Sequence, residues 1–401
     1  MTISKGVSKK VAYKKQTAFG TTATGTGAKY LRRVTSNFNL TKENYESNEI
    51  RTDYQVADMR HGIRSVDGSL NGELSAGSYA DFMASVVARD FTAVTAITGL
   101  SVTIAASGNL YTVTRASGDW LVDGVKVGHI FRLSGAGLTA INASNNLQVV
   151  GLTATVATVA VVNGSSLVAE GPIASVTATV VGKQTFAPLT SHTDDSYTIE
   201  EWYSDVAQSE VFDSVKFGTM NVQLPTTGLV TIDFSAMGRD MTEGTSQHFT
   251  TPTASGTTGI FSSVSGILIV NGAAVGLITQ ADFTIERGLE AANVIGQNTA
   301  ADIFTGRIRV TGNFSTYFTD GTFRGYFLNE DTISVVFTVA DSEDKDAAFV
   351  TFTLPKVKLG SATKSDGEMG IVQDHSFTAL LNDVTSGGLP ETTIMIQDST
   401  L

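Results

Sequence analysis

The chain has 401 residues, no cysteine, 39 glycines and a formal net charge of −12. The lack of cysteine excludes disulfide scaffolds, thiolate metal sites and cysteine nucleophiles. Charged residues make up only 16% and hydrophobic residues 42%, which excludes bulk disorder and favours a β-rich protein with extensive protein–protein contacts. No apolar run of about 18 residues is present, and the basic start lacks the apolar segment of a signal peptide. We therefore expect no membrane insertion and no Sec export.

Basic residues are concentrated at the beginning of the chain. The first 40 residues contain eight basic residues and no acidic residue, so the rest of the chain is strongly acidic. A basic N-terminal arm over residues 1–33 on an acidic body predicts a segment that docks on a neighbouring copy. A frayed basic terminus is the alternative. Nucleic-acid binding is disfavoured, because the acidic body would repel phosphates and the basic residues are not interleaved with aromatic ones.

Residues 65–74 alternate with period two, which is typical of a half-buried strand. Apolar residues and glycines share one face. The other face is wholly polar and consists of Ser65, Asp67, Ser69, Asn71 and Glu73. A sheet of this kind packs on a core on one side and faces water on the other. After the strand, Ser78 and Asp81 fit a capping box and apolar residues follow at helical spacing, which predicts an amphipathic helix.

The same pattern returns later in the chain. Its polar positions are Arg309, Thr311, Asn313 and Ser315. The glycines at 68 and 312 are 244 residues apart, residues 37–40 match residues 282–285 at a spacing of 245, and Phe234 matches Phe377 at a spacing of 143. We interpret these matches as a tandem duplication of one β-rich domain that contains a single helix. Chance similarity is the alternative.

A distinct segment separates the two halves of the first repeat. Residues 110–114, 120–135 and 153–162 are short Ala-, Val- and Thr-rich runs with glycine and Asn-Gly turns between them, which predicts a small β-barrel or Ig-like sandwich inserted on the outside of the scaffold. The predicted fold is therefore mainly β, with two tandem sandwich or barrel domains, one α-helix in each, and this insert. The expected order is a basic arm at 1–33, the first domain at 34–99 and 187–245 around an insert at 100–186, the second domain at 246–385, and a C-terminal tail at 386–401.

Signatures of catalysis or metal binding are weak in this sequence. The five histidines have no metal-binding spacing and no HExxH motif occurs. Residues 361–364 match S-x-x-K only formally, because no partner motif follows. The acidic segment 341–346 lacks the glycine and terminal glutamate of a calcium loop and is expected to be a solvated hairpin loop. We therefore expect no enzyme activity, no cofactor and no metal.

Several segments, taken in order, resemble the major tail tube proteins of siphophages. The opening residues 9–21 and 31–36 look like the start of these proteins. The run 62–82, with its Val-x-Gly-x-Leu strand and Gly-x-Tyr-x-x-Phe helix start, is similar to their inner strand and helix, and the run 120–135 resembles an insert found in one branch of them. No single motif is diagnostic, but together the segments cover most of the chain.

The resemblance implies a structural virion protein that is assembled in the cytoplasm of the host bacterium. Its subunits would form stacked rings around a β-barrel channel for the phage genome, without sequence-specific DNA binding. Members with a duplicated domain form trimeric rings of pseudo-sixfold shape; without the repeat, a trimer and a hexamer stay open. Partners would be other copies and the tail tip, tape measure and tail terminator proteins. Alternatives are another virion β-protein, such as a tail terminator or capsid decoration protein, and a bacterial surface adhesin.

The resemblance also assigns roles to surfaces. The polar faces of the two repeated strands, described above, would line the channel, and lumen charge would differ between the repeats because Ser65 and Asp67 correspond to Arg309 and Thr311. The basic arm and the loops 41–61 and 286–305 would reach neighbouring rings. The expected inter-ring residues are Lys9, Lys10, Lys14, Lys15, Arg32, Arg33, Glu43, Glu46, Glu49, Arg51, Asp53, Arg287 and Glu290.

Overall fold

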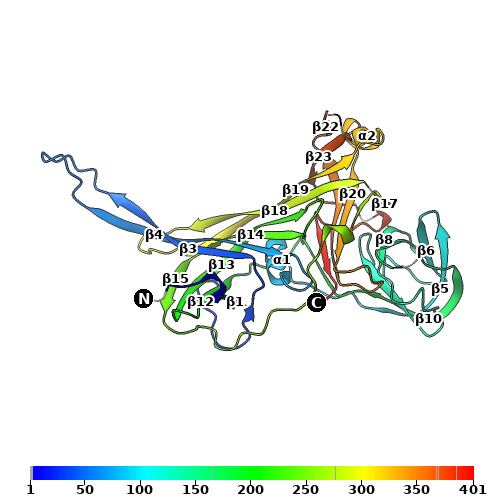
Figure 1. Cartoon of the computed structure of the whole chain (residues 1–401), viewed down its shortest axis with the longest axis horizontal. Coiled ribbons are helices and arrows are strands. Elements are labelled where there is room, and N and C mark those ends of the chain that lie inside the picture. The colour runs from blue at the N-terminus through cyan, green and yellow to red at the C-terminus, as the bar shows by residue number, and fades with distance from the viewer. Residues whose placement is uncertain (1–2, 165, 276, 367, 369, 385) are drawn as a thin grey trace.

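The computed structural model describes residues 3–164, 166–275, 277–366, 368, 370–384 and 386–401. The chain is mainly β, as predicted, and its described part contains the α-helices α1 (Ala80–Val87) and α2 (Thr322–Leu328). Figure 1 shows an elongated molecule with a long hairpin at one end and a small barrel at the other. No helix in the described ranges combines the length and the apolar character needed to span a membrane.

One antiparallel sheet, here called the long sheet, runs through the middle of the molecule. Its strands, in spatial order, are β3 (Thr35–Glu46), β4 (Met59–Glu73), β14 (Thr231–Gly238), β13 (Gln208–Leu224), β18 (Ile278–Ala292), β19 (Asp302–Tyr317) and β23 (Val372–Ala379). The direct pairing of β13 with β18 joins the two sequence repeats in a single sheet. The apolar face of this sheet forms one side of the main core.

Two further layers cover the apolar face of the long sheet. The first outer layer contains β2 (Lys29–Tyr30), β1 (Lys9–Lys15), β12 (Tyr197–Tyr203), the start of β13, and β15 (Asp240–Gly244). The second contains β17 (Ala273–Ala274), β16 (Gly266–Val270), β20 (Ile333–Ala340), β21 (Phe349–Leu359), β24 (Met395–Asp398) and β11 (Lys183–Phe186). Aromatic pairs such as Phe82–Phe217 and Phe283–Phe352 fill the space between the layers.

The remaining short elements are η1 (Gly6–Ser8), η2 (Ser263–Ser265), β22 (Thr363–Lys364) and η3 (Ser386–Gly388).

The strand pairings of the first repeat recur in the second repeat. The corresponding pairs are β1–β12 and β16–β20, β12–β13 and β20–β21, β13–β15 and β21–β24, β13–β14 and β21–β23, β4–β14 and β19–β23, and β3–β4 and β18–β19. The register also recurs, because Phe38 lies opposite Gly68 and Phe283 lies opposite Gly312. These positions differ by the spacings of 245 and 244 found in the sequence.

The spacing of 143 expected for the closing strands is wrong. Ala236 lies opposite Gly68, whereas Phe377 lies opposite Gly312. Ala236 therefore corresponds to Phe377, at a spacing of 141, and Phe234 corresponds to His375. A shift of two residues keeps the same face of a strand buried, so apolar patterning alone could not detect the error.

The insert is a closed barrel, which is one of the two forms predicted for it. Its strands follow the spatial order β10 (Glu170–Val180), β5 (Ile97–Ser107), β6 (Leu110–Arg115), β9 (Val156–Val161), β8 (Leu147–Leu152) and β7 (Ile130–Ser134). The run 120–135 forms a strand only from Ile130; its first part is a turn that places Trp120 in the barrel core, stacked on Phe131. β11 lies outside the barrel, because it pairs with β24 of the second outer layer.

The barrel is fixed to the second outer layer by buried amide side chains. The Gln397 side chain accepts a hydrogen bond from the Ile130 N–H at 2.9 Å and donates to the carbonyls of Ile130 and Val181, both at 2.8 Å. Gln148 donates to Thr338 Oγ1 at 2.8 Å. The loop 341–346 contributes Lys345, which donates to two barrel carbonyls at 3.0 Å. This loop is a hairpin loop, as expected, but it packs against the barrel rather than projecting freely into solvent.

Both ends of the chain join the body of the molecule. β1 pairs along its whole length with β12, so the basic segment is not a free arm over residues 9–15. β24 is buried and pairs with β21 and β11, so residues 395–398 are a sheet strand and not a tail. Neither strand has a clear amphipathic signal in the sequence, because the three central residues of β1 are buried in succession and β24 is buried throughout.

Helix α1 forms where expected, but the predicted capping box is wrong. The helix begins at Ala80, and no side chain caps its first turn. The Ser78 hydroxyl lies 2.7 Å from Ser75 Oγ instead. The Asp81 carboxylate accepts hydrogen bonds from Tyr13 Oη at 2.9 Å and Lys29 Nζ at 2.7 Å. Tertiary partners from the first outer layer therefore take the place of the local cap.

Candidate channel and assembly surfaces

The two polar strand faces predicted from the sequence lie on the same side of the long sheet. In β4, the side chains at 65, 67, 69, 71 and 73 are exposed or half-buried, and they alternate with the buried Val66, Leu70 and Leu74. In β19, Arg309 and Asn313 are exposed and Thr311 and Ser315 half-buried, whereas the residues between them are buried. The alternation of both strands is therefore confirmed by burial.

The polar surface continues across the junction between the repeats, and we call it the channel face. One row of directly opposed residues runs Asn71, Asp233, Asn221, Thr284, Thr311 and Thr378. The sequence analysis missed the contributions of β13, β14, β18 and β23. The alternation Thr231, Asp233, Ser235 around Ile232 and Phe234 could have revealed β14.

The channel face is mainly acidic. Within the paired rows its carboxylates are Asp67, Glu73, Asp233, Asp282, Glu286 and Asp374, and its basic groups are those of Arg309 and of Lys358, which lies opposite Thr378. Neutral donors hold several of these acids, as where Asn71 Nδ2 donates to Asp233 at 2.5 Å and Ser315 Oγ to Asp374 at 2.5 Å. Partial burial raises the pKa of Asp282. A hydrated surface of this charge repels DNA phosphates.

The β3–β4 hairpin extends far beyond the rest of the molecule (Figure 1). The expected contact residues Glu43, Glu46, Glu49, Arg51 and Asp53 all lie on it and are exposed. Its tip also exposes Ile50 at 102% and Tyr54 at 98% of their full surface. Exposed apolar side chains clustered at the end of a protrusion are typical of an interaction site.

The loop between β18 and β19 lies at the base of this hairpin. The Arg64 N–H donates to the Asn298 carbonyl at 2.8 Å. Glu290 is exposed, as expected for a contact residue. Arg287 is not available for such a contact, because it is buried in its own chain, with its guanidinium donating to the Ser85 carbonyl at 3.3 Å and to Thr305 Oγ1 at 2.6 Å.

The basic residues of the N-terminal segment have partners within the chain. Lys9 pairs with Glu201, and Lys15 Nζ lies 2.8 Å from Asp195. Lys14 donates to the carbonyls of Thr24 and Thr26, Arg32 to that of Thr258, and Arg33 to that of Lys9, each at 2.7 Å. Lys10 stays exposed beside a groove of about 980 Å³ that Arg32 and Arg33 also line. Contacts with another copy would add to these internal ones.

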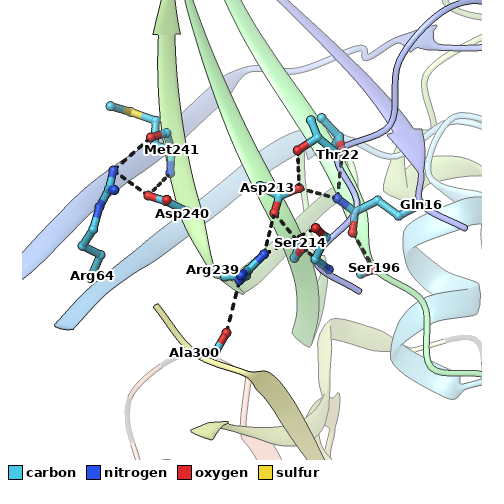
Figure 2. A network of polar contacts seen from close by, with 12 residues as sticks. Gln16, Thr22, Arg64, Ser196, Asp213, Ser214, Arg239, Asp240, Met241 and Ala300 are labelled. Carbon is cyan, nitrogen blue, oxygen red and sulfur yellow. Dashed lines mark hydrogen bonds and ion pairs between the residues drawn. The ribbon is translucent and has the colours of Figure 1, made fainter. Parts of the chain in front are cut away.

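Figure 2 shows a polar network that connects the N-terminal segment with the loop between β18 and β19, and a second group of contacts around Arg64 of the hairpin. Asp213 accepts hydrogen bonds from Gln16 Nε2 at 2.7 Å and Thr22 Oγ1 at 3.0 Å, and it lies 3.8 Å from Arg239 Nη1. Arg239 donates to the Ala300 carbonyl at 3.2 Å. Close by, Arg64 Nη2 lies 2.6 Å from Asp240. The contacts of Arg239 therefore join Asp213 of the first repeat with Ala300 of the second, and the Arg64–Asp240 pair lies beside them.

The described residues give no support to a catalytic or metal site. Within them, no group of three or more His, Asp or Glu side chains could hold a metal ion. Ser361 shares a hydrogen bond of 2.8 Å with Ser376, and the Lys364 ammonium lies over the Phe318 ring. The S-x-x-K match is therefore not arranged as a nucleophile and its base. His375 is packed between Phe314 and Phe323, and burial lowers its pKa to about 4.

Comparison with protein families gives a match over nearly the whole chain. Residues 6–379 match the family described as phage tail tube protein. No curated protein matches the chain. Proteins of this family are structural, non-enzymatic components of the virion tail that assemble into a tube. Because the match covers the first repeat with its inserted barrel and most of the second repeat, the chain belongs to the phage tail tube protein family.

Proposed function

We propose that this protein is the major tail tube subunit of a long, non-contractile phage tail and that its stacked rings enclose the path of the genome. The observation that carries the proposal is the channel face, a polar surface that continues through both repeats of one sheet. Its polar side chains on β4, β14, β18 and β19 are exposed or half-buried. In a closed tube this face would form the inner wall.

The charge of the channel face fits the passage of DNA. A duplex carries about one negative charge per 1.7 Å of its axis and binds tightly wherever lysine or arginine neutralises its phosphates. Carboxylates outnumber basic residues on this wall, and most of its other side chains are neutral and hydrated. DNA would therefore slide through without being retained or read.

The recurrent strand pairings support a ring built from two tube units per chain. The first unit would comprise residues 34–99 and 187–245 around the insert, and the second would comprise residues 246–385. We add β1 to the first unit and β24 to the second, because each pairs within that unit. Three chains would then supply six units, which favours a trimeric ring of pseudo-sixfold shape over a hexamer. The barrel would lie on the outside.

Contacts between rings would come from the hairpin and the neighbouring loops. The hairpin residues named above, together with Glu290, Lys10 and the exposed remainder of the basic segment, are our candidates for this surface. We propose that the same axial surfaces meet the tail tip, tape measure and tail terminator proteins at the ends and in the lumen of the tube. The assembled protein would form in the host cytoplasm and remain in the virion.

Electron microscopy of the purified protein in negative stain tests this function. We expect hollow tubes of stacked rings, each with three outer knobs that correspond to the barrels. Six knobs on each ring would keep the function and contradict the two-unit ring. A protein that stays monomeric at high concentration, and also after incubation with a tail tip complex, would contradict the tube function.

A further inference from the structure

A buried lysine joins the two repeats inside one chain. Lys216, on β13, has a side chain only 2% exposed, and its ammonium lies 2.8 Å from Asp194 and 3.0 Å from Asp302. It also donates to the Ile303 carbonyl at 2.7 Å. Asp194 precedes β12 of the first repeat, whereas Asp302 begins β19 of the second. A buried ammonium is stable only when charges and acceptors surround it in this way, so Lys216 depends on both repeats.

Lys358 of the second repeat corresponds to Lys216, but only one of the two acidic partners of Lys216 has a counterpart beside it. Lys216 lies opposite Met237 and Lys358 opposite Thr378 at the corresponding point of the β21–β23 pair. The counterpart of Asp194 is Glu330, whose carboxylate lies 3.7 Å from Lys358 Nζ. The Lys358 side chain is 43% exposed, and among the described residues no second acid takes the place of Asp302 beside it.

The missing acid can be identified from the strand register. Glu46 lies opposite Met59 in the first repeat and Ala291 opposite Ile303 in the second, and both hairpins have their irregularity at the same place. Asp302 therefore corresponds to Asp58, which directly precedes β4 where the connecting loop at the tip of the long hairpin ends. Asp58 contacts Arg60 in its own chain and is exposed. A second copy of the chain can bring this carboxylate to Lys358.

The strand edges beside these two lysines differ in the same way: the edge is paired at the junction of the repeats and open at the corresponding place in the second repeat. Inside the chain, β13 pairs with β18, so that Asn221 lies opposite Thr284. The counterpart of β18 is β3, and the counterpart of residues 219–223 is the segment 361–365. Within the described ranges, β3 pairs with β4 and residues 363–364 pair with β23, and neither has a strand partner on its other edge. An unpaired strand edge is a template for pairing with another chain.

The two helices also differ in burial, as expected if another copy covers α2 where the second repeat covers α1. The α1 residues Met83 and Ala84 are buried, with β18 of the second repeat packed nearby. Their counterparts on α2, 244 residues later, are Phe327 and Leu328, which are both exposed. The second helix thus presents an apolar face where the first is covered by the following repeat.

We infer that neighbouring copies in a ring meet as the two repeats meet inside one chain. Strand β3 of one copy pairs with residues 361–365 of the next, with Asn39 opposite Thr363. Asp58 of the copy that supplies β3 then completes the ion-pair site of Lys358 in the next copy. The first repeat of the copy that supplies β3 also covers the exposed face of α2 in the next copy. This assignment rests on the proposed tube function, because it needs rings of identical copies.

Introduced cysteine pairs test the register of β3 against residues 361–365 of the next copy. Because the chain has no native cysteine, only the introduced ones can form disulfides. Directly opposed residues in an antiparallel pair have Cβ atoms about 4.5–5.5 Å apart, which allows a disulfide. Asn39→Cys with Thr363→Cys should give covalent multimers on a non-reducing gel when tubes are oxidised. Asn221→Cys with Thr284→Cys is the matched intrachain reference and should oxidise within one chain.

A displaced cysteine serves as the negative control. Thr35→Cys with Thr363→Cys moves one thiol by four residues, or about 13 Å along the strand, and should give at least tenfold less cross-linked product. Tubes in which this control cross-links as well as the Asn39 pair, or in which neither pair does, would overturn the inference and leave the tube function intact. A chain that forms no tubes would overturn both.

Charge reversal tests the ion pair by a separate route. Lys358→Glu and Asp58→Lys alone should each reduce the yield of tubes at least tenfold, and the double variant should restore most of it. Glu343→Lys makes the same charge change as Asp58→Lys at an exposed site near the barrel and should leave the yield unchanged. Assembly by both single variants, or no recovery in the double variant whose folding is confirmed by its unfolding curve, would contradict the Lys358–Asp58 contact.

Discussion

At the scale of single residues, two glycines make room for aromatic rings beneath the channel face. A Cβ atom at Gly68 would lie 2.0 Å from the Phe38 ring, and one at Gly312 would lie 2.5 Å from the Phe377 ring. Overpacking of this kind costs about 1–3 kcal/mol. We therefore expect Gly68→Ala to lower the free energy of unfolding by about 1–3 kcal/mol in urea titrations. Gly288→Ala, where a Cβ would meet nothing within 4 Å, should change it by less than about 0.5 kcal/mol, and equal losses in both variants would contradict this account.

A buried histidine at the barrel junction should make stability depend on pH. His129 accepts a hydrogen bond from the Lys126 N–H at Nδ1 and contacts Gln184 at Nε2, and burial lowers its pKa to about 4. Between pH 4 and about 6.5 the unfolded chain binds a proton that the folded chain excludes. The stability that the neutral ring provides is therefore complete above pH 6.5 and is lost as the pH falls towards 4.

The corresponding experiment compares unfolding curves of the wild type and His129→Gln between pH 7.5 and 4. We expect the wild type to lose up to about 3 kcal/mol more than the variant over this range. The difference isolates His129 from the carboxylates, which titrate in both proteins. Parallel pH profiles would mean that His129 does not titrate in this way.

At the scale of elements, the apolar tip of the hairpin should act in assembly and not in folding. Ile50 and Tyr54 make no contact with the body of the molecule that would stabilise it. We expect Ile50→Ser with Tyr54→Ser to leave the unfolding midpoint within about 1 °C of the wild type, because surface changes are nearly neutral. The same variant should shorten the tubes or reduce them to single rings in electron micrographs.

A matched surface variant is available on the barrel. Val122 is also largely exposed, and Val122→Ser removes a similar apolar side chain far from the hairpin. Its tubes should have normal length. Short tubes in both variants, or normal tubes in the hairpin variant, would contradict the assignment of the hairpin to contacts between rings.

The sequence predicted those elements whose burial alternates and missed those fixed by partners distant in the chain. The polar faces of β4 and β19 could be predicted from the sequence, because one side of each strand is buried and the other is exposed to solvent. β24 is buried on both sides and short, so it looked like a tail. Arg287 looked like a surface residue because its burial depends on α1, more than 200 residues away. The capping box failed because Ser78 contacts Ser75 and because tertiary partners hold Asp81.

At the scale of the whole molecule, the acidic character of the channel face should keep DNA from binding. Ser69 and Ser235 lie directly opposite each other on this face. Tubes with Ser69→Lys and Ser235→Lys should retain short duplex DNA in pelleting assays at low salt and release it as salt is raised. Wild-type tubes should not retain it. Ser69→Asn with Ser235→Asn is the control without charge, and DNA retention by the wild type would contradict the proposed function of the face.

The central claim is that the polar side of one continuous sheet forms the inner wall of a tube. A three-dimensional reconstruction of assembled tubes by electron cryomicroscopy tests it most directly. We predict a lumen lined by β4, β14, β13, β18, β19 and β23 through their polar side chains, with the barrel on the outer surface and β3 paired across the boundary between copies. A tube whose lumen is lined by the barrel, or whose channel face points outward, would contradict the account.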